Sequence, residues 1–253
     1  MIYIAFLFFL FFILAISFYH LQYFMMFKPT YYRSTELDDR FEVLSITTND
    51  GVELEGVVYK AHNHKATMLF FSGRFHDGVG AIEKMSYAYP DIRIIIFNYR
   101  SYGRSGGKLN EKNIFSDALH ITRIIKKNFG DIYVAGFSLG SSIASYVASV
   151  ESVTSVFLIG PFDSIGKITK MKYGINLALI SRYKFDNTKF VQKIEADTYI
   201  FSSKADNVSY INNVRNLKTY VKNLVYYKEF EDLTHNELLF NEDIVKEISG
   251  FIR

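Results

Sequence analysis

One pentapeptide, Gly-Phe-Ser-Leu-Gly at Gly136–Gly140, constrains what this chain can fold into more than any other stretch. A short apolar, β-rich run precedes it at Ile132–Ala135, and a run of small residues typical of a buried helix follows at 141–148. The two glycines allow a turn from strand to helix that is sharp enough to lift Ser138 out of the sheet. The pattern therefore predicts a strand, a tight turn with an exposed serine, and a helix. In the alternative interpretation, the stretch is an ordinary connection in which Ser138 caps the helix.

Composition limits the fold and the kind of partner. The 253 residues are enough for one α/β domain with an appendage and too few for two full domains. The net charge of +3 is small and the lysines and arginines are scattered, so nucleic-acid binding gains no support. The chain has no cysteine, which excludes disulfides, thiolate metal sites and a cysteine nucleophile.

The N-terminal segment 1–27 contains no Asp, Glu, Lys or Arg, and Ile2–Tyr19 is almost continuously apolar. A helix of this length matches the hydrocarbon thickness of a bilayer. We interpret 1–27 as an uncleaved transmembrane anchor. A cleaved signal peptide is the alternative, although only Ala15–Ser17 resembles a cleavage site and no Lys or Arg precedes the apolar run. Lys28 and Arg33 follow the segment, which favours a cytoplasmic location for the rest of the chain.

The chain after a linker at 28–40 has the pattern of an α/β domain. Two alternating runs at Phe41–Thr47 and Val52–Tyr59 predict a β-hairpin. Buried apolar runs then alternate with helix-length segments, which predicts a mostly parallel twisted sheet of about eight strands with helices on both faces. We expect the further strands at Thr67–Phe71, Ile92–Phe97, Ile132–Ala135, Val156–Ile159, Thr198–Phe201 and Val225–Phe230, and helices at Val79–Ala88, Asn113–Asn128, Ser138–Val150, Asn207–Val221 and Asn241–Ile252.

The connection at 163–195 is longer than a simple crossover between parallel strands. It contains several apolar residues at helical spacing, which predicts a small helical cap over the site. The alternative is an ordinary core helix followed by a loop. In either case the α/β domain is expected to span 41–253.

Three residues of the types that nucleophilic serine catalysis uses follow one another as serine, acid and histidine, an order that one class of serine hydrolases has. Such catalysis needs a base that takes the hydroxyl proton and a carboxylate that orients the base. Asp206 lies in a loop after one of the last strands, and His235 lies in a loop after the final strand. Both are expected at the carboxyl ends of the strands, where Ser138 and the ligand sites of open α/β sheets also lie. Asp163 follows a strand as well and is the competing acid, with helix capping as its alternative role.

The oxyanion of a tetrahedral intermediate needs two hydrogen-bond donors. One expected donor is the backbone N–H of Leu139, directly after the serine, and the other is the backbone N–H of Arg74 in the loop after Thr67–Phe71. Gly73 lets this loop turn inward. The Arg74 side chain is expected to face water or, alternatively, to favour an anionic substrate group. This chemistry requires neither a metal ion nor an organic cofactor.

Six motifs follow one another in one order, at Phe70–Arg74, Phe97–Gly107, Gly136–Gly140, Gly160–Ser164, Asp206 and Thr234–Asn236. Together they resemble the α/β-hydrolase superfamily. Within it, the chain is similar to a membrane-associated group of serine hydrolases that includes protein depalmitoylases and serine aminopeptidase-like proteins. The resemblance covers nearly all of the chain from Phe41 to Arg253. It implies the α/β-hydrolase fold with Ser138, Asp206 and His235 as the catalytic triad.

The chain departs from that group's pattern at five positions, Ser72, Arg74, Ser101, Ser203 and Thr234, the first two replacing His and Asn and the others replacing Gly. The oxyanion donors are backbone groups, so the changes at Ser72 and Arg74 bear on substrate preference more than on chemistry. Arg100, in the second motif, is expected to be structural and to pair with a carboxylate or with loop carbonyls beneath the site.

The residues and the resemblance together imply a membrane-anchored serine hydrolase that cleaves carboxylic esters or thioesters. The anchor and the apolar cap favour an acyl substrate near the bilayer. Three alternatives share the fold: a peptidase, an acyltransferase, and a catalytically silent binding protein at the membrane. A silent protein of this fold typically lacks a member of the triad, and all three members are present here.

Overall fold

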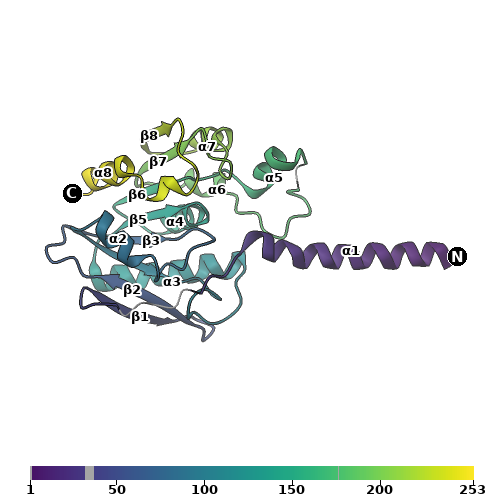
Figure 1. Ribbon diagram of the computed structural model, residues 1–253, viewed down its shortest axis with the longest axis horizontal. Coiled ribbons are helices and arrows are strands. Elements are labelled where there is room, and N and C mark those ends of the chain that lie inside the picture. The colour runs from purple at the N-terminus through teal and green to yellow at the C-terminus, as the bar shows by residue number, and fades with distance from the viewer. Residues whose placement is uncertain (1, 32–36, 176) are drawn as a thin grey trace.

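The computed structural model of the chain describes residues 2–31, 37–175 and 177–253. Its strands are β1 (Phe41–Thr47), β2 (Glu53–Tyr59), β3 (Ala66–Phe71), β4 (Ile92–Phe97), β5 (Tyr133–Phe137), β6 (Ser155–Ile159), β7 (Asp197–Ser203) and β8 (Leu224–Phe230). They form a sheet of eight strands in the order β1-β2-β4-β3-β5-β6-β7-β8 (Figure 1). β1, β2 and β4 pair antiparallel, and the strands from β4 to β8 run parallel to one another.

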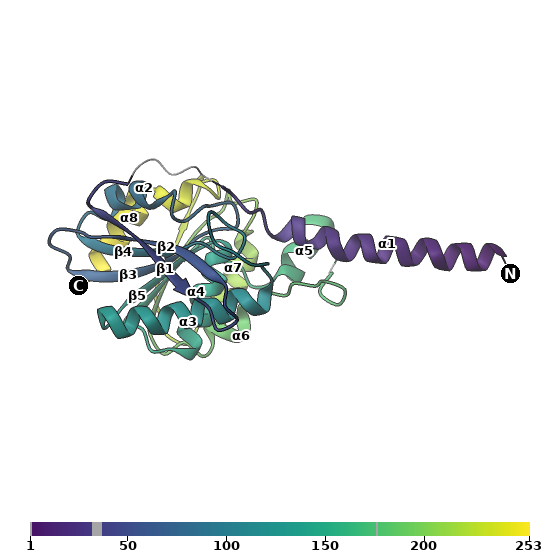
Figure 2. The same ribbon diagram turned by 90° about the horizontal axis from the view of Figure 1, so that it is seen from below.

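Helices cover both faces of the sheet, as the sequence predicted (Figure 2). The helices are α1 (Ile2–Met26), α2 (Ile82–Ala88), α3 (Glu111–Phe129), α4 (Leu139–Val150), α5 (Ile165–Tyr173), α6 (Thr188–Val191), α7 (Ile211–Lys218), the 3-10 helix η1 (Glu237–Phe240) and α8 (Glu242–Phe251). Along β3, Leu69 and Phe71 enter the core under α3, α4 and α7, whereas Met68 and Phe70 enter the core under α2 and α8. This alternation buries both faces of a parallel strand.

Two element boundaries differ from prediction for a physical reason. The helix expected from Asn207 begins only at Ile211, because the amides of Val208 and Ser209 both donate to the Asp206 carboxylate and hold this stretch in a turn. The helix expected from Val79 begins at Ile82, after a turn in which the Gly78 amide donates to the Asn98 side chain. In both places a side chain accepts hydrogen bonds from backbone amides in the turn just before the helix begins.

The N-terminal helix α1 extends away from the domain (Figures 1 and 2). It is long and apolar enough to cross a membrane, a property that a signal sequence near the N-terminus shares. Its last turns pack against the domain, where Gln22 and Met26 are buried. Phe27, directly after the helix, is fully buried against the ring of Tyr183. Residues 32–36 of the expected linker, including Arg33, lie outside the described residues.

The segment 163–195 divides between the cap and the core. α5 lies beside the last turns of α1 (Figures 1 and 2). α6 instead packs against α4, where the Ser142 hydroxyl donates to the Asn187 side chain. The small helical cap therefore consists of α5 and the loop after it.

Candidate active site

Ser138 occupies a strained turn between β5 and α4. Its backbone has φ 54° and ψ −116°, a conformation that a residue with a side chain adopts only where the surroundings enforce it. The turn closes because its glycines have no Cβ. A Cβ on Gly136 would lie 2.2 Å from the Gly140 carbonyl oxygen, and one on Gly140 would lie 1.9 Å from the Phe71 carbonyl oxygen. The Ser138 side chain makes no capping hydrogen bond to α4, which contradicts the alternative interpretation of this stretch.

Asp206 and His235 lie together at the carboxyl ends of the last strands. The Nδ1 atom of His235 lies 2.7 Å from Oδ2 of Asp206. The other carboxylate oxygen, Oδ1, accepts hydrogen bonds from the amides of Val208 and Ser209, each 2.8 Å long. These bonds hold the carboxylate in place and leave Oδ2 for the imidazole. Since Nδ1 is engaged in this way, Nε2 of His235 is the ring nitrogen that can exchange a proton with a substrate or a hydroxyl.

Ser138 and His235 line the same cavity. No hydrogen bond joins the two side chains within the described residues. The His235 ring packs against the ring of Phe137, with 4.9 Å between their centroids. Its Cε1 atom would lie 3.2 Å from a Cβ on Gly160, whose φ is 54°. Phe137 and Gly160 thus both lie against the imidazole beside the turn that carries Ser138.

Both carboxylate oxygens of the competing acid, Asp163, accept hydrogen bonds from groups other than His235. Asp163 is fully buried, and its Oδ1 accepts from the Ser164 amide at 2.6 Å and the Asn213 side chain at 2.8 Å. Its Oδ2 accepts from the Asn216 side chain at 2.8 Å. Asp163 therefore joins the end of β6 to α7. Its predicted role as a helix cap is wrong, because the side chain that caps α5 is that of Ser164.

The two backbone donors expected for an oxyanion are unused. In the described part of the chain, the amides of Leu139 and Arg74 have no hydrogen-bond acceptor. Leu139 begins α4, so its amide belongs to the positive end of the helix dipole. The loop that carries Arg74 is fixed by two tyrosines, since Tyr99 donates to the Ser72 carbonyl at 2.6 Å and Tyr102 donates to the Arg74 carbonyl at 2.7 Å.

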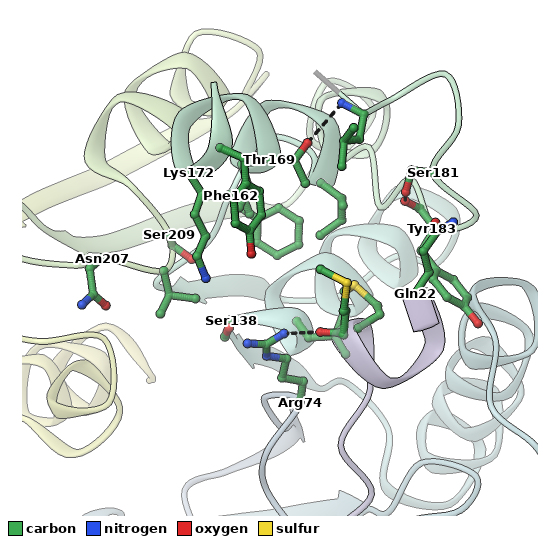
Figure 3. Close-up of a pocket in the computed structure, with 18 of the residues that line it drawn as sticks. Gln22, Arg74, Ser138, Phe162, Thr169, Lys172, Ser181, Tyr183, Asn207 and Ser209 are labelled. Atoms are coloured by element: carbon green, nitrogen blue, oxygen red, sulfur yellow. Dashed lines mark hydrogen bonds between the residues drawn. The ribbon is translucent and has the colours of Figure 1, made fainter. Parts of the chain in front are cut away.

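The Arg74 side chain is partly buried against α1 instead of simply facing water as expected. Its Nη1 donates to the carbonyl oxygen of Met25 at 2.6 Å (Figure 3). Its guanidinium also lies 4.4 Å from the ring centroid of Phe75. Burial lowers the pKa of this guanidinium. The carbonyls of the last turn of a helix have no partner within the helix, and a cation there is favourable. The end of α1 thus provides the partner that sequence analysis missed.

The expected structural role of Arg100 is confirmed. Its Nε and Nη2 atoms each donate to Asp117 at 2.7 Å, and its Nη1 and Nη2 atoms each donate to Asp50 at 2.7 Å. The next residue, Ser101, has φ 67°, which explains why glycine is usual at this position of the motif. The Ser101 hydroxyl donates to the Gly107 carbonyl at 2.7 Å and secures the turn.

Ser138 lies between two cavities of different character. The first, called the apolar cavity, has a volume of about 190 Å³ and lies between the end of α1 and α5 (Figure 3). The second, called the polar cavity, has a volume of about 450 Å³ and contains His235. The apolar cavity is lined by residues including Phe18, Met25, Met26, Phe162, Ile165 and Ile168. The polar cavity is lined by His76, Thr234, His235 and Asn236 together with Phe75 and Phe137, and Arg74, Asn207 and Val208 line both cavities.

His76 is a site residue to which sequence analysis gave no role. Its ring lines the polar cavity, and its Nδ1 atom is buried without a hydrogen-bond partner among the described residues. Burial, and then the nearby His235, lower the pKa of His76. The available signal was its position in the loop after a parallel strand, where functional residues of open α/β sheets gather.

Curated proteins match part of the chain. It is 34% identical over 128 residues to the lysophosphatidylserine lipase ABHD12 of Xenopus tropicalis, which covers 47% of this chain and 32% of that protein. It is 28% identical over 137 residues to an uncharacterized membrane protein of Saccharomyces cerevisiae, YNL320W, which covers 51% of this chain and 48% of that one. The matched part is thus a third to a half of the length of each relative. No protein-family model matches the chain.

Solved structures match nearly all of the domain. The esterase Pf2001 of Pyrococcus furiosus superposes with a TM-score of 0.71 at 18% identity, covering 89% of this chain and 96% of the esterase. Est1E of Butyrivibrio proteoclasticus, solved with ferulic acid, gives 0.66 at 16% identity and covers 83% of this chain and 98% of that one. These likenesses show a shared fold over nearly all of the domain. The chain is therefore a protein of the α/β-hydrolase fold.

Proposed function

We propose that this chain is a membrane-anchored serine hydrolase that cleaves carboxylic esters or thioesters of acyl groups. The observation that carries the proposal is the 2.7 Å contact between His235 and Asp206 at a cavity that the strained Ser138 also lines. The partial match to a lysophosphatidylserine lipase and the shared fold with esterases support ester hydrolysis. We further propose that residues 1–27 anchor the protein, that 28–40 link the anchor to the catalytic domain, and that this domain faces the cytoplasm.

In the proposed reaction, Oγ of Ser138 attacks the acyl carbonyl carbon while Nε2 of His235 takes the hydroxyl proton. Asp206 accepts the Nδ1–H bond and stabilises the imidazolium. The amides of Leu139 and Arg74 donate to the oxyanion. The carbonyl then re-forms, the bond to the leaving oxygen or sulfur breaks, and His235 gives its proton to the leaving group. A water molecule, deprotonated by His235, then attacks the acyl-enzyme carbonyl. The bond from the acyl carbon to Oγ of Ser138 breaks, His235 returns the proton to Oγ, and the carboxylic acid is released.

The two cavities fit the two parts of such a substrate. The apolar cavity is lined largely by aliphatic and aromatic side chains, which suit the acyl chain. The polar cavity contains His235, which must reach the leaving atom, together with the side chains of Thr234 and Asn236. We assign the acyl chain to the apolar cavity and the alcohol or thiol to the polar cavity. An acyl thioester on a protein, as in depalmitoylation, is one substrate of this type.

A fluorophosphonate probe tests the proposal, because it reacts covalently with an activated serine. The full-length chain in detergent micelles is expected to label, and Ser138→Ala and His235→Ala are expected not to. Ser149→Ala, which removes a hydroxyl from the other end of α4, is the matched control and is expected to label like the parent. A folded parent that does not label would favour the silent binding protein. Product analysis with an added alcohol then separates hydrolysis from acyl transfer.

A further inference from the structure

The last turns of α1 form one wall of the apolar cavity. Phe18, Met25 and Met26 line it from α1, and Ile165 and Ile168 line it from α5. Ser138 and Arg74 lie together at one edge of this space (Figure 3). The helix that would cross the membrane therefore contributes side chains next to the proposed nucleophile.

Gln22 joins α1 to the cap. It is only 9% exposed, although it lies in a helix whose other side chains are mostly exposed. Its Oε1 accepts from the Arg182 amide at 2.6 Å, and its Nε2 donates to the Ile180 carbonyl at 3.4 Å. The Arg182 guanidinium also lies 4.4 Å from the ring centroid of Tyr19. These contacts fix the loop after α5 against α1 and so close one side of the cavity.

A second set of contacts joins α1 to the loop that carries the proposed oxyanion donor. Arg74 donates from its side chain to the Met25 carbonyl and accepts at its own carbonyl from Tyr102. The Tyr102 hydroxyl in turn accepts from the Lys28 amide at 3.0 Å. The end of α1 and the oxyanion loop are therefore held in one arrangement on both sides of Arg74.

The length of α1 places the cavity at the membrane surface. The helix has 25 residues, which at about 1.5 Å each span about 37 Å, whereas a hydrocarbon core is about 30 Å thick. If the first residues cross that core, the last turn, from Gln22 onward, emerges from it. The cap loop beside it exposes apolar side chains, including Leu179 at 96% and Ile180 at 62%. Exposed apolar side chains flanked by cations such as Lys172 and Arg182 are typical of a membrane interface.

We propose that α1 is part of the acyl-binding site and that Met25 and Met26 determine which acyl chains are accepted. The inference rests on the proposed ester hydrolysis and extends it by naming the substrate class. The substrate is a long-chain acyl ester or thioester that resides in the bilayer. Its chain passes between α1 and α5 into the apolar cavity, and its carbonyl reaches Ser138 without leaving the interface.

The steric test uses full-length protein in phosphatidylcholine vesicles and p-nitrophenyl esters from acetate to palmitate. Met25→Trp fills the cavity from α1 and is expected to lower kcat/KM for the long esters about tenfold or more relative to acetate. Leu21→Trp is the matched control, because Leu21 is exposed on the same helix and does not line the cavity. Met26→Ala, which removes bulk instead, is expected to shift the preference toward longer chains.

A fluorescence test covers the case in which Met25→Trp does not fold. The chain has no tryptophan, so Phe18→Trp provides a single emitter in the cavity wall. Reaction of Ser138 with a long-chain alkyl fluorophosphonate is expected to shift the emission of Phe18→Trp and to leave that of Leu21→Trp unchanged. If the parent cleaves esters and labels, but neither the chain-length profile nor the emission responds, the role of α1 is overturned and the proposed function stands. A folded parent that neither cleaves esters nor labels overturns both.

Discussion

The two sides of Ser138 are built in different ways. On the side of the polar cavity, backbone groups hold much of the proposed catalytic pair, since two amides orient Asp206 and the backbone of Gly160 adjoins His235. On the side of the apolar cavity, side chains from two helices form the walls, and one of these helices leaves the domain. A few polar contacts, such as those of Gln22, hold that side together.

This difference separates the groups proposed to carry out the reaction from the groups proposed to bind the substrate. Backbone hydrogen bonds and tight turns leave few arrangements open to Asp206 and His235, as a site for proton transfer requires. Helix side chains can change in size without moving those groups. We therefore expect changes on the polar side to affect whether the reaction occurs, and changes on the apolar side to affect which acyl group reacts.

The largest expected effect distinguishes two buried acids at the ends of neighbouring strands. Asp206→Asn is expected to lower kcat on every ester by about 10⁴-fold, because the amide no longer stabilises the imidazolium and favours the wrong tautomer of His235. Asp163→Asn is expected to destabilise the fold by about 1 to 3 kcal/mol, through lost bonds to Asn213 and Asn216, with much smaller loss of kcat. Esterase rates and thermal unfolding measure the two effects. Equal losses of kcat in the two variants would contradict the assignment.

The next-largest expected effect comes from comparing a glycine in the turn around Ser138 with a glycine at the end of α5. Gly140→Ala places a methyl group 1.9 Å from the Phe71 carbonyl oxygen and is expected to cost about 3 kcal/mol or more, because backbone must move. Gly174→Ala, at the end of α5, meets no atom within 4 Å and carries only the strain of its φ of 73°, about 1 kcal/mol. Chemical denaturation of both variants gives the comparison. A smaller cost at Gly140 than at Gly174 would show that the serine turn relaxes more readily than its contacts imply.

A smaller effect is expected at the junction of α1 with the cap. Gln22→Ala removes the bonds to Ile180 and Arg182 and is expected to weaken the protection of the cap loop by about 1 kcal/mol. Amide hydrogen exchange of residues 177–184 measures this change against the exchange of β5, which should stay constant. Gln192→Ala, an exposed change at the end of α6, is the control. Exchange that rises equally in β5 would indicate general destabilisation instead of local loosening.

Sequence patterns predicted the parts of the molecule that depend on local order. The apolar runs predict the parallel sheet, and the glycines around Ser138 predict the turn that carries it. Both patterns depend only on residues that are close together in the sequence. The partner of Arg74 lies 49 residues away in α1, and that of Gln22 lies 160 residues away in the cap. Nothing in the periodicity of either segment encodes such a contact. For the same reason the apolar run of α1 indicated a membrane helix but not a cavity wall.

The smallest expected effect concerns His76 and the loss of stability as the pH falls. Burial, followed by the charge of His235, lowers the pKa of His76 below its ordinary value of 6.5, so the fold favours the neutral ring. As the pH falls, the unfolded chain therefore binds the proton before the folded protein does. The stability that neutral His76 contributes is complete above pH 6.5, and it is lost as the pH falls toward the pKa of His76 in the folded protein. His76→Asn should therefore reduce the fall in Tm on acidification by less than about 3 °C. His62→Asn, in an exposed turn, makes the same change of composition away from the site and should leave the fall unaltered. A fall as steep in His76→Asn as in the parent would mean that the ring is solvated, and the polar side would then be less tightly built than its hydrogen bonds indicate.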